Sequence, residues 1–241
     1  MPLDRHRGAL RSLLGKRAGQ HPKGVVSRME ENIVKDAYRN VARWYDRIFE
    51  PMDRGLRLIG LGMSRPKEGM TVLDVGCGTG THLELYSRYK CSLSGIDCSP
   101  SMLEIARKRL GDKADLHLGD ASMMPYEDGS FDLVISMLVL HEMNHATRSS
   151  VLREMKRVLK DAGRMLLIDY HPGPIGSLRG WRTKLVILAS EVAAGREHFK
   201  NYRSYMALNG LPALVREHGL IVEKRRVVSG GTLALFLVRT Q

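Results

Sequence analysis

Residues 72–80 read VLDVGCGTG, an apolar segment that contains Asp74 and ends in three glycines at alternate positions, Gly76, Gly78 and Gly80. A pattern typical of an amphipathic helix follows directly, so the glycines lie in a turn between a strand and a helix. Glycine allows backbone conformations that bring amide N–H groups and a helix N-terminus close to a ligand. We therefore interpret the segment as a cofactor-binding turn, against the alternative of a turn that only joins two elements.

The spacing of the glycines distinguishes this turn from that of dinucleotide-binding proteins. Those proteins use Gly-x-Gly-x-x-Gly, which places a pyrophosphate at the helix N-terminus, whereas this chain has Gly-x-Gly-x-Gly over residues 76–80. The carboxylate of Asp74 would repel phosphates, but it can organise the loop amides or approach an ammonium group. S-adenosylmethionine (SAM) has an ammonium group and no phosphate, so the turn favours SAM as the cofactor.

Two further acidic residues follow the next predicted strands. Asp97 lies 21 residues after Gly76, close to the distance at which a doubly wound fold places a carboxylate for ribose hydroxyls. Asp120 follows a short apolar strand and can accept a hydrogen bond from an adenine amino group. Each could instead be a helix cap or a turn residue. Together with Asp74 they form a constellation at three successive strand ends, which supports one cofactor site.

The alternation of strands and helices predicts an α/β fold with a doubly wound, mostly parallel seven-stranded sheet of the Rossmann-like kind. The predicted strands span 71–75, 92–96, 115–118, 131–136, 164–169, 220–228 and 232–239, and the helices between them span 81–89, 101–110 and 147–160. An amphipathic helix over 28–59, broken at Pro51, precedes the sheet. Helices over 177–195 and 197–216, the second interrupted at Gly210 and Pro212, form a lid insertion at about 172–216.

The net charge of +12 is concentrated in two flanks. Residues 1–28 contain seven basic side chains and one acidic, and residues 179–241 contain eleven basic and four acidic. We predict a basic tail over 1–28, disordered or in contact with a membrane, and one domain over 29–241. Basic flanks suit an anionic membrane surface or nucleic acid, or they form a solvated charged surface. An aromatic content of 6% makes nucleic acid the less favoured partner.

The cysteine content and the lack of long apolar segments indicate the cellular compartment. The chain has three cysteines and no secretory signal pattern, and Cys77 lies inside the glycine turn, where a disulfide would be awkward. No uninterrupted apolar run approaches the roughly 18 to 20 residues that a membrane-spanning helix needs. These features predict a cytoplasmic protein, with peripheral association at the inner membrane face as an extension of that prediction.

With these motifs in place, the chain resembles the class I SAM-dependent methyltransferases. The resemblance is carried by VLDVGCGTG at 72–80, GIDCSPSML at 95–103, GDASMMPYEDGSFDLVIS at 119–136 and LREMKRVLKDAGRMLLIDY at 152–170. It is strongest to the ubiquinone/menaquinone C-methyltransferases (UbiE-like), whose Ala-x-x-Tyr-Asp, Tyr-Arg and Ser/Thr-Gly-Gly elements match 42–46, 202–203 and 229–231. Those quinone enzymes carry Gly-Leu/Ile-Arg-Asn after the fourth strand, whereas this chain has VLHEM at 139–143.

The resemblance implies a set of cofactor contacts. SAM is the implied cofactor and S-adenosylhomocysteine the product. The residues expected to contact SAM are Asp74, Gly76, Cys77 and Gly78 near the methionine moiety, Asp97 on the ribose, Cys98 and Met102 against the adenine, and Asp120 and Ala121 at the adenine edge.

Two residues after the fourth strand are the catalytic candidates, His141 and Glu142, because the resembling enzymes place substrate-facing residues there. His141 leads as a base or an orienting group, since an imidazole of ordinary pKa accepts a proton at neutral pH; a hydrogen-bonded structural histidine is the alternative. No metal is expected, because methyl transfer from a sulfonium is an in-line displacement and the cysteines and histidines lack zinc-site spacing.

Substrate contacts are expected from the two segments that surround the sheet. The candidates are Tyr45, Tyr170, His171, Tyr202 and Arg203; Arg203 could hold a phosphate or enolate oxygen, or form an exposed ion pair. The apolar residues of the first lid helix either line a substrate pocket or pack on the sheet; they are Val186, Ile187, Leu188 and Val192.

Three functions are consistent with these features. The leading hypothesis is a SAM-dependent methyltransferase that acts on an apolar or amphiphilic small molecule, such as a quinone precursor or a lipid-like acceptor. The second is an RNA or protein methyltransferase that docks through the basic flanks. The third is a module that binds SAM or S-adenosylhomocysteine without transferring a methyl group, because the glycine and acidic motifs report binding rather than turnover.

Overall fold

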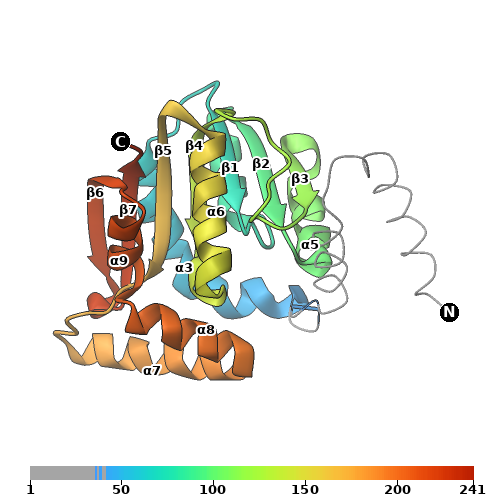
Figure 1. Ribbon diagram of the computed structural model, residues 1–241. Coiled ribbons are helices and arrows are strands. Elements are labelled where there is room, and N and C mark those ends of the chain that lie inside the picture. The colour runs from blue at the N-terminus through green and yellow to red at the C-terminus, as the bar shows by residue number, and fades with distance from the viewer. Residues whose placement is uncertain (1–35, 37, 40–41) are drawn as a thin grey trace. The chain divides into compact units, whose positions relative to one another are not determined.

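The computed structural model describes residues 36, 38, 39 and 42–241, so the predicted basic tail over 1–28 lies outside the described residues (Figure 1). Within them, seven strands form one sheet in the order β3-β2-β1-β4-β5-β7-β6. Neighbours from β3 to β5 are parallel, and β7 is antiparallel to both β5 and β6. The predicted α/β fold with a doubly wound, mostly parallel sheet is confirmed.

The elements follow the predicted order along the chain. The strands are β1 (Thr71–Val75), β2 (Ser92–Asp97), β3 (Ala114–Leu118), β4 (Phe131–Met137), β5 (Leu159–Tyr170), β6 (Ile221–Val228) and β7 (Leu233–Arg239). The α-helices are α3 (Ala42–Ser64), α4 (Thr81–Tyr86), α5 (Pro100–Leu110), α6 (His145–Val158), α7 (Leu178–Ala193), α8 (Arg196–Ala207) and α9 (Gly210–Glu217). Short 3-10 helices are η1 (Ser87–Tyr89), η2 (Gly111–Lys113), η3 (Leu140–Glu142) and η4 (Ser229–Gly231).

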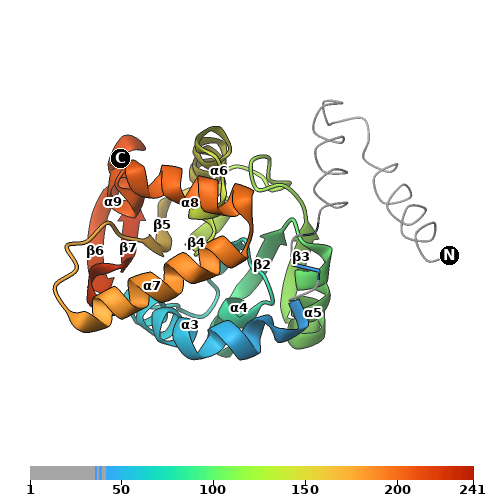
Figure 2. The ribbon, with the colours of Figure 1, turned by 90° about the horizontal axis from the view of Figure 1, so that it is seen from below.

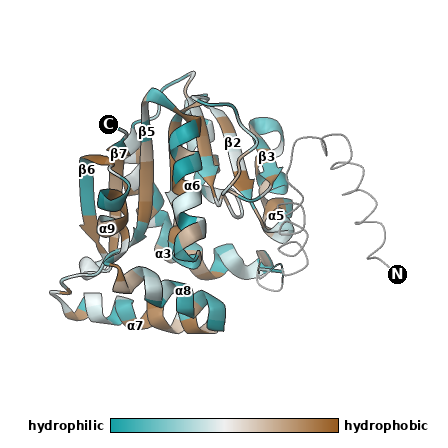
Figure 3. Ribbon diagram, viewed as in Figure 1, coloured by the Kyte–Doolittle hydropathy of each residue, from teal (hydrophilic) through white to brown (hydrophobic). Residues whose placement is uncertain are grey.

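The sheet lies between two helical layers. Helices α3, α4 and α5 cover one face, and α6 and α9 cover the other (Figures 1 and 2). The central strands carry continuous apolar runs because they are buried on both faces, and Figure 3 shows hydrophobic residues concentrated in the strands. Val72, Val134 and Leu166 are fully buried.

The strand order determines where a ligand binds. Strands β1 and β4 are neighbours, although β2 and β3 lie between them in the sequence. The winding of the sheet therefore reverses between β1 and β4, and in such sheets ligands bind outside the carboxyl ends of the strands at this reversal. Helices α7 and α8 lie across the same carboxyl edge, with α3 beside them (Figure 2).

Hydrogen-bonded caps explain where several helices begin. The Ser99 side chain accepts a hydrogen bond from the Met102 amide at the start of α5, and Asn144 accepts one from the Thr147 amide at the start of α6. Ser177 caps α7 in the same way. These side chains satisfy amide groups that have no partner within the helix, so the sequence specifies the first turn of each.

The structure corrects three predicted boundaries. Helix α3 continues through Pro51 to Ser64, so the predicted break there is wrong; the lost backbone hydrogen bond is offset by burying one helix face against β5 and β7. Strand β5 begins at Leu159, inside the predicted helix over 147–160, because Leu159 pairs with Phe131 of β4. The interruption of the second lid helix lies at Asn209, which has a left-handed backbone, φ 67°.

No helix in the described part of the chain combines the length and apolar character needed to cross a bilayer.

Candidate active site

The glycine turn after β1 is held by backbone hydrogen bonds to the end of β2. Gly76 and Gly78 have φ values of +74° and +52°, a region that favours glycine. The Gly76 amide donates to the Ile96 carbonyl at 2.8 Å, and the Gly78 amide donates to the Asp97 carboxylate at 2.8 Å. A Cβ on Gly76 would lie 2.4 Å from Cγ2 of Val139, so the turn also contacts the segment after β4.

Asp97 organises the cofactor side of this edge. Its second carboxylate oxygen accepts a hydrogen bond of 2.8 Å from the Ser99 amide. Burial raises the pKa of Asp97, although the amides of Ser99 and Gly78 act in the opposite direction. Asp120 accepts a 2.8 Å hydrogen bond from the Ser122 amide and forms a turn. The strand ends therefore lie together as expected, while the ribose and adenine contacts stay predictions.

The segment before the sheet covers the glycine turn. Thr79 donates a 2.6 Å hydrogen bond to Asp46 of α3, and Arg109 of α5 forms an ion pair with the same carboxylate. Asp36 accepts hydrogen bonds from the Ser99 and Ser101 hydroxyls at the start of α5. These contacts bind α3 and its preceding residues to the predicted cofactor site.

Aromatic rings accompany these polar contacts. Tyr45 packs between Tyr38 and Phe49, with ring centroids 5.9 Å and 4.7 Å away. Burial raises the pKa of Tyr45, and the charges of Glu142 and Asp97 raise it further. Tyr45 therefore lies within the electrostatic influence of Glu142 and Asp97, and its contact with the substrate stays a prediction.

A buried charge cluster supports Asp74. Arg57 of α3 is buried, forms an ion pair with Glu50 and lies 3.5 Å from Asp53. Burial raises the pKa of Asp74 to about 7, and Arg57 opposes that shift. Burial likewise raises the pKa of Asp53, to about 6, against the same arginine. Burial therefore disfavours the charged form of the carboxylate expected near the cofactor, and Arg57 of α3 offsets part of that effect.

The remaining predicted cofactor residues have different environments. Cys77 is buried, and its Sγ lies where a Cβ on Gly95 would come within 2.8 Å, so its side chain packs on β2. Met102 is buried, Ala121 is half-buried and Cys98 is exposed. Their proposed adenine contacts remain predictions, and Cys77 is placed to contribute its backbone rather than its thiol.

A second polar group lies at the carboxyl ends of β4 and β5. His141 Nδ1 is 2.8 Å from the Asp169 carboxylate, which also accepts hydrogen bonds from the amides of Leu140, His141 and Tyr170. His141 Nε2 is 3.4 Å from Glu191 of α7, and the Tyr170 hydroxyl donates to that same Glu191 at 2.8 Å. All these side chains are almost completely buried.

Glu142 and His198 complete this group. Glu142 accepts a 2.6 Å hydrogen bond from the Tyr38 hydroxyl, and its oxygen lies 3.5 Å from Nε2 of His198 on α8. The same His198 nitrogen is 3.8 Å from Glu191. We refer to the four residues His141, Glu142, Glu191 and His198 as the His–Glu cluster.

The environment of His141 bears on its predicted role. Burial disfavours the charged imidazolium, but Asp169 and Glu191 outweigh burial and raise the pKa of His141 to about 10. This pKa lies above the ordinary value on which the prediction of a base depended. The hydrogen bond to Asp169 fits the alternative of a hydrogen-bonded histidine, and the role of His141 as a base or an orienting group stays a prediction. Burial raises the pKa of Glu142 to about 7, and His141 opposes that shift.

The predicted substrate residues fall into two sets. Tyr170 and Tyr202 are buried and meet edge to face at 5.3 Å, and Tyr170 reaches the His–Glu cluster. His171 Nδ1 lies 3.1 Å from the Gly231 carbonyl, so this ring nitrogen contacts the backbone of η4. Arg203 is exposed, with its guanidinium 5.9 Å from the Phe199 ring centroid, so the structure does not bring it to the cluster.

The apolar residues of the first lid helix do not behave as one group. Only Ile187 is buried, where it lines a small hollow with Tyr170 and Tyr202. Val186, Leu188 and Val192 are exposed on α7, so neither the predicted pocket lining nor packing on the sheet holds for them.

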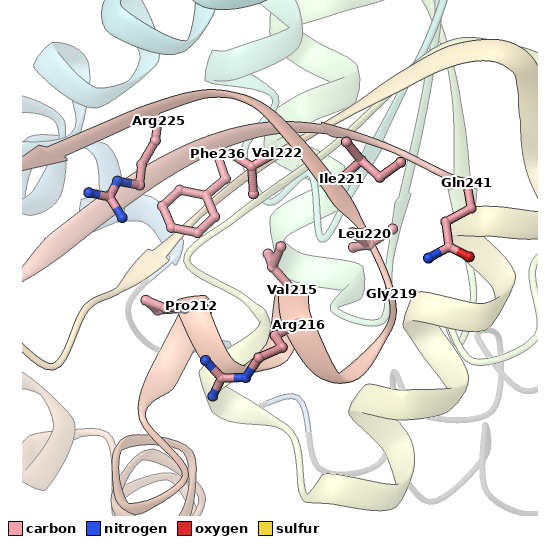
Figure 4. A pocket seen from close by; sticks show the side chains of 10 residues that line it. All are labelled: Pro212, Val215, Arg216, Gly219, Leu220, Ile221, Val222, Arg225, Phe236 and Gln241. Atoms are coloured by element: carbon pink, nitrogen blue, oxygen red, sulfur yellow. The ribbon is translucent and has the colours of Figure 1, made fainter.

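A larger hollow lies away from this edge (Figure 4). It is lined by residues of α9, the start of β6 and the end of the chain, among them Pro212, Ile221 and Gln241. Strand β6 runs in the same direction as β5, so its first residues lie at the amino edge of the sheet. The hollow is therefore at the opposite edge from the glycine turn.

Several site residues were not predicted from the sequence. Arg148 of α6 is fully buried and donates to the carbonyls of Leu140 and Met143 at 2.7 Å, which holds η3 in place. Asp169 lies in the motif at 152–170, at the end of a predicted strand, and this position could have identified it as a site residue. The others gave no local signal; they are Asp36, Arg57, Glu191 and His198.

Comparison with known proteins supports a family assignment. A family model for a methyltransferase domain matches residues 73–167, which include the glycine turn, Asp97 and η3. The matched segment is a methyltransferase domain, and the similarity to proteins named as methyltransferases supports assignment to the class I SAM-dependent methyltransferases. The prediction of a methyltransferase and the prediction of SAM as its cofactor are both confirmed.

Three similar proteins illustrate the relationship. A demethylmenaquinone methyltransferase from Thermotoga maritima is 34% identical over 147 residues, which cover 56% of this chain and 63% of that protein. The ubiquinone/menaquinone biosynthesis C-methyltransferase UbiE of Bordetella avium is 29% identical over 208 residues, covering 78% and 80%. Phosphoethanolamine N-methyltransferase 2 of Haemonchus contortus, solved in complex with SAM, has a TM-score of 0.58 and 17% identity, covering 78% of this chain and 53% of that one.

The partial coverage of these alignments limits the conclusions that they support. This methyltransferase spans less than two thirds of the length of the Thermotoga relative. The similarity to the Haemonchus enzyme is a similarity of fold. Family and cofactor therefore follow from the comparisons, and the acceptor does not.

Proposed function

We propose that this methyltransferase transfers the methyl group of SAM to an apolar or amphiphilic small molecule. The relatives named as quinone methyltransferases support this class of acceptor. Quinone C-methylation itself is a narrower proposal, because VLHEM at 139–143 replaces the Gly-Leu/Ile-Arg-Asn segment of the quinone enzymes at the edge where the acceptor is expected.

The observation that carries the proposal is the outer face of α7. Leu178, Trp181, Leu185 and Val192 follow a helical spacing and are all exposed, with Leu185 64% accessible. Arg179, Arg182 and Lys184 belong to the same helix. An apolar stripe next to cationic side chains suits the surface of an anionic membrane, in which amphiphilic acceptors are dissolved.

The residues at the carboxyl edge fit the cofactor that the family implies. The positive φ values of Gly76 and Gly78 let backbone amides approach a ligand closely, and Asp97 lies at the end of β2, where ribose hydroxyls would be bound. When bound, SAM supplies the activated methyl carbon. The protein aligns the acceptor in line with that carbon and keeps water away, and the buried surroundings of Tyr170 and Tyr202 support that task.

A fractionated cell extract tests the acceptor class. Purified protein and SAM with a radiolabelled methyl group are incubated with lipid, quinone, RNA and protein fractions, and an Asp97→Ala variant serves as the inactive control. We expect label in the lipid or quinone fraction with the wild-type protein alone. Label confined to RNA or protein would contradict the proposal. Saturable SAM binding without label in any fraction would favour a binding module.

A further inference from the structure

We propose that the His–Glu cluster binds a divalent transition-metal ion at the carboxyl ends of β4 and β5. The donor atoms come from η3, α7 and α8; they are Nε2 of His141, Nε2 of His198 and carboxylate oxygens of Glu142 and Glu191. The proposal goes beyond the proposed function, because it requires neither SAM nor a methyl acceptor.

The distances between the donors fit one ion. His141 Nε2 and a Glu191 oxygen are 3.4 Å apart, and His198 Nε2 is 3.5 Å from Glu142 and 3.8 Å from Glu191. Ligand atoms of His141, Glu142 and His198 all lie within 4.8 Å of one another. Donors about 2.0 to 2.2 Å from a tetrahedral ion are roughly 3.3 to 3.6 Å from each other. The contacts of 3.4 Å and 3.5 Å match that spacing. Glu191 faces His141 with one carboxylate oxygen and His198 with the other, and the more distant donors would have to move inward around an ion.

Among the residues that the structure describes, two donor atoms have no hydrogen-bond partner. They are Oε2 of Glu191, whose side chain is 4% exposed, and Nε2 of His198. A carboxylate oxygen without a partner is costly in a buried position, and native proteins rarely leave one. A cation between the four side chains supplies the missing partner for both atoms.

The surroundings hold the donors in the orientation that metal sites require. Asp169 binds Nδ1 of His141 at 2.8 Å, which leaves Nε2 directed toward Glu191. Tyr170 donates to Glu191, and Tyr38 donates to Glu142. Ligating histidines in metal sites usually donate their second ring N–H to a carboxylate, and ligating carboxylates are in turn hydrogen-bonded.

A proton shared between His141 and Glu191 explains fewer of the observed contacts than a metal ion does. A proton between His141 and Glu191 would account for their 3.4 Å contact. It would leave Nε2 of His198 and Oε2 of Glu191 without partners. The mixed set of imidazole and carboxylate donors favours zinc, iron or manganese over magnesium, which prefers oxygen ligands and retains water. Sequence spacing gave no sign of the site, because 56 residues separate Glu142 from His198.

The test measures metal binding by the full chain. Protein freed of metal by a chelator is titrated with Zn²⁺ by calorimetry, and a parallel sample is loaded with Co²⁺ to record its visible absorption. We expect one ion per chain and the strong absorption of low-coordinate Co²⁺. His198→Ala and Glu191→Gln should each weaken Zn²⁺ binding by at least about 100-fold, and Asp169→Asn by about 10- to 100-fold.

The matched control is His145→Ala, which removes an exposed histidine 3.0 Å from Glu217 and should leave Zn²⁺ affinity unchanged. SAM binding and circular dichroism establish that each variant is folded. A folded wild-type chain that binds SAM but not stoichiometric Zn²⁺ would overturn this inference and leave the proposed function intact. Equal Zn²⁺ affinity in His198→Ala and wild-type protein would overturn it as well.

Discussion

Thr79 of the glycine turn donates a 2.6 Å hydrogen bond to Asp46 of α3. The two residues are 33 positions apart, and Asp46 also forms an ion pair with Arg109 of α5. One carboxylate therefore joins three elements around the cofactor turn. This gives a physical role to the Tyr-Asp pair at 45–46, which the sequence offered only as a family pattern.

Replacing Thr79 by valine tests that connection. Thr79→Val keeps the shape of the side chain but removes the donor, so the free energy of unfolding should fall by about 1 to 3 kcal/mol. Urea denaturation measures the change. Thr183→Val is the control, since its hydroxyl donates only to Arg179 within α7; its effect should stay within about 0.5 kcal/mol. Equal losses in the two variants would show that the contact with Asp46 adds nothing.

A methyl group at Gly76 tests the contact between the turn and Val139. Gly76→Ala should destabilise the fold by more than about 3 kcal/mol, because backbone strain adds to a clash of 2.4 Å with Val139. Gly69→Ala has a similar positive φ, +82°, and among the described residues no atom lies within 4 Å of the new Cβ, so it should cost only about 1 to 2 kcal/mol. Adding Val139→Ala to Gly76→Ala should recover part of the loss. Thermal denaturation of the wild type, Gly76→Ala, Val139→Ala and the double variant completes the cycle.

Removing the negative charge of Asp97 tests the cofactor site. In Asp97→Asn one oxygen is replaced by a donor, so the amides of Gly78 and Ser99 no longer share a carboxylate and ribose hydroxyls lose an acceptor. SAM affinity should fall by at least about 10-fold, which is 1.4 kcal/mol. Calorimetric titration measures it, with Asp112→Asn at an exposed position as the control. Unchanged affinity in Asp97→Asn would remove Asp97 from the site.

The sequence predicted local features better than distant ones. The glycine turn and Asp97 follow from residues within one strand-turn-helix unit, and the structure brings them together. The His–Glu cluster depends on the placement of α7 and α8 against η3, which no local pattern encodes. The pKa of His141 depends on burial and on Asp169, 28 residues away. At Pro51, tertiary packing outweighed a local helix-breaking preference.

The raised pKa of Asp74 predicts a specific dependence of stability on pH. Its pKa is about 7 in the folded protein and about 4 in an unfolded chain. Between these values the folded state retains a proton that the unfolded state has lost, so the contribution of Asp74 to the free energy of unfolding falls as pH rises from 4 to 7. It is fully lost above pH 7. Asp74→Asn has no such titration and should gain about 2 to 3 kcal/mol relative to wild type between pH 5 and pH 8.

Asp53 provides the matched comparison for that experiment. Its pKa is about 6, so the relative gain of Asp53→Asn should end near pH 6, one unit below that of Asp74→Asn. Urea denaturation of the three proteins at unit steps of pH distinguishes the profiles. A difference between Asp74→Asn and wild type that stays constant from pH 5 to pH 8 would contradict the raised pKa.

The outer face of α7 predicts binding to anionic vesicles. Trp181 and Leu185 are 55% and 64% exposed and lie one turn apart, so both can enter a lipid surface together. Each apolar side chain contributes about 1.5 to 3 kcal/mol when fully buried, and replacing both by serine should weaken vesicle binding by at least about 10-fold. Sedimentation with phosphatidylglycerol vesicles measures the loss, and phosphatidylcholine vesicles should bind the wild type more weakly because Arg179, Arg182 and Lys184 lose their attraction.

The control for this variant lies at the other edge of the sheet. Tyr89 and Val222 are 41% and 42% exposed and precede or begin strands at the amino edge, away from α7. Their double replacement by serine removes two exposed apolar side chains far from α7 and should leave vesicle binding unchanged. If the two double variants lose binding equally, general hydrophobicity and not α7 mediates the interaction. If neither variant loses binding, α7 does not contact the membrane. The proposal that the acceptor is dissolved in the lipid phase then loses its main structural support.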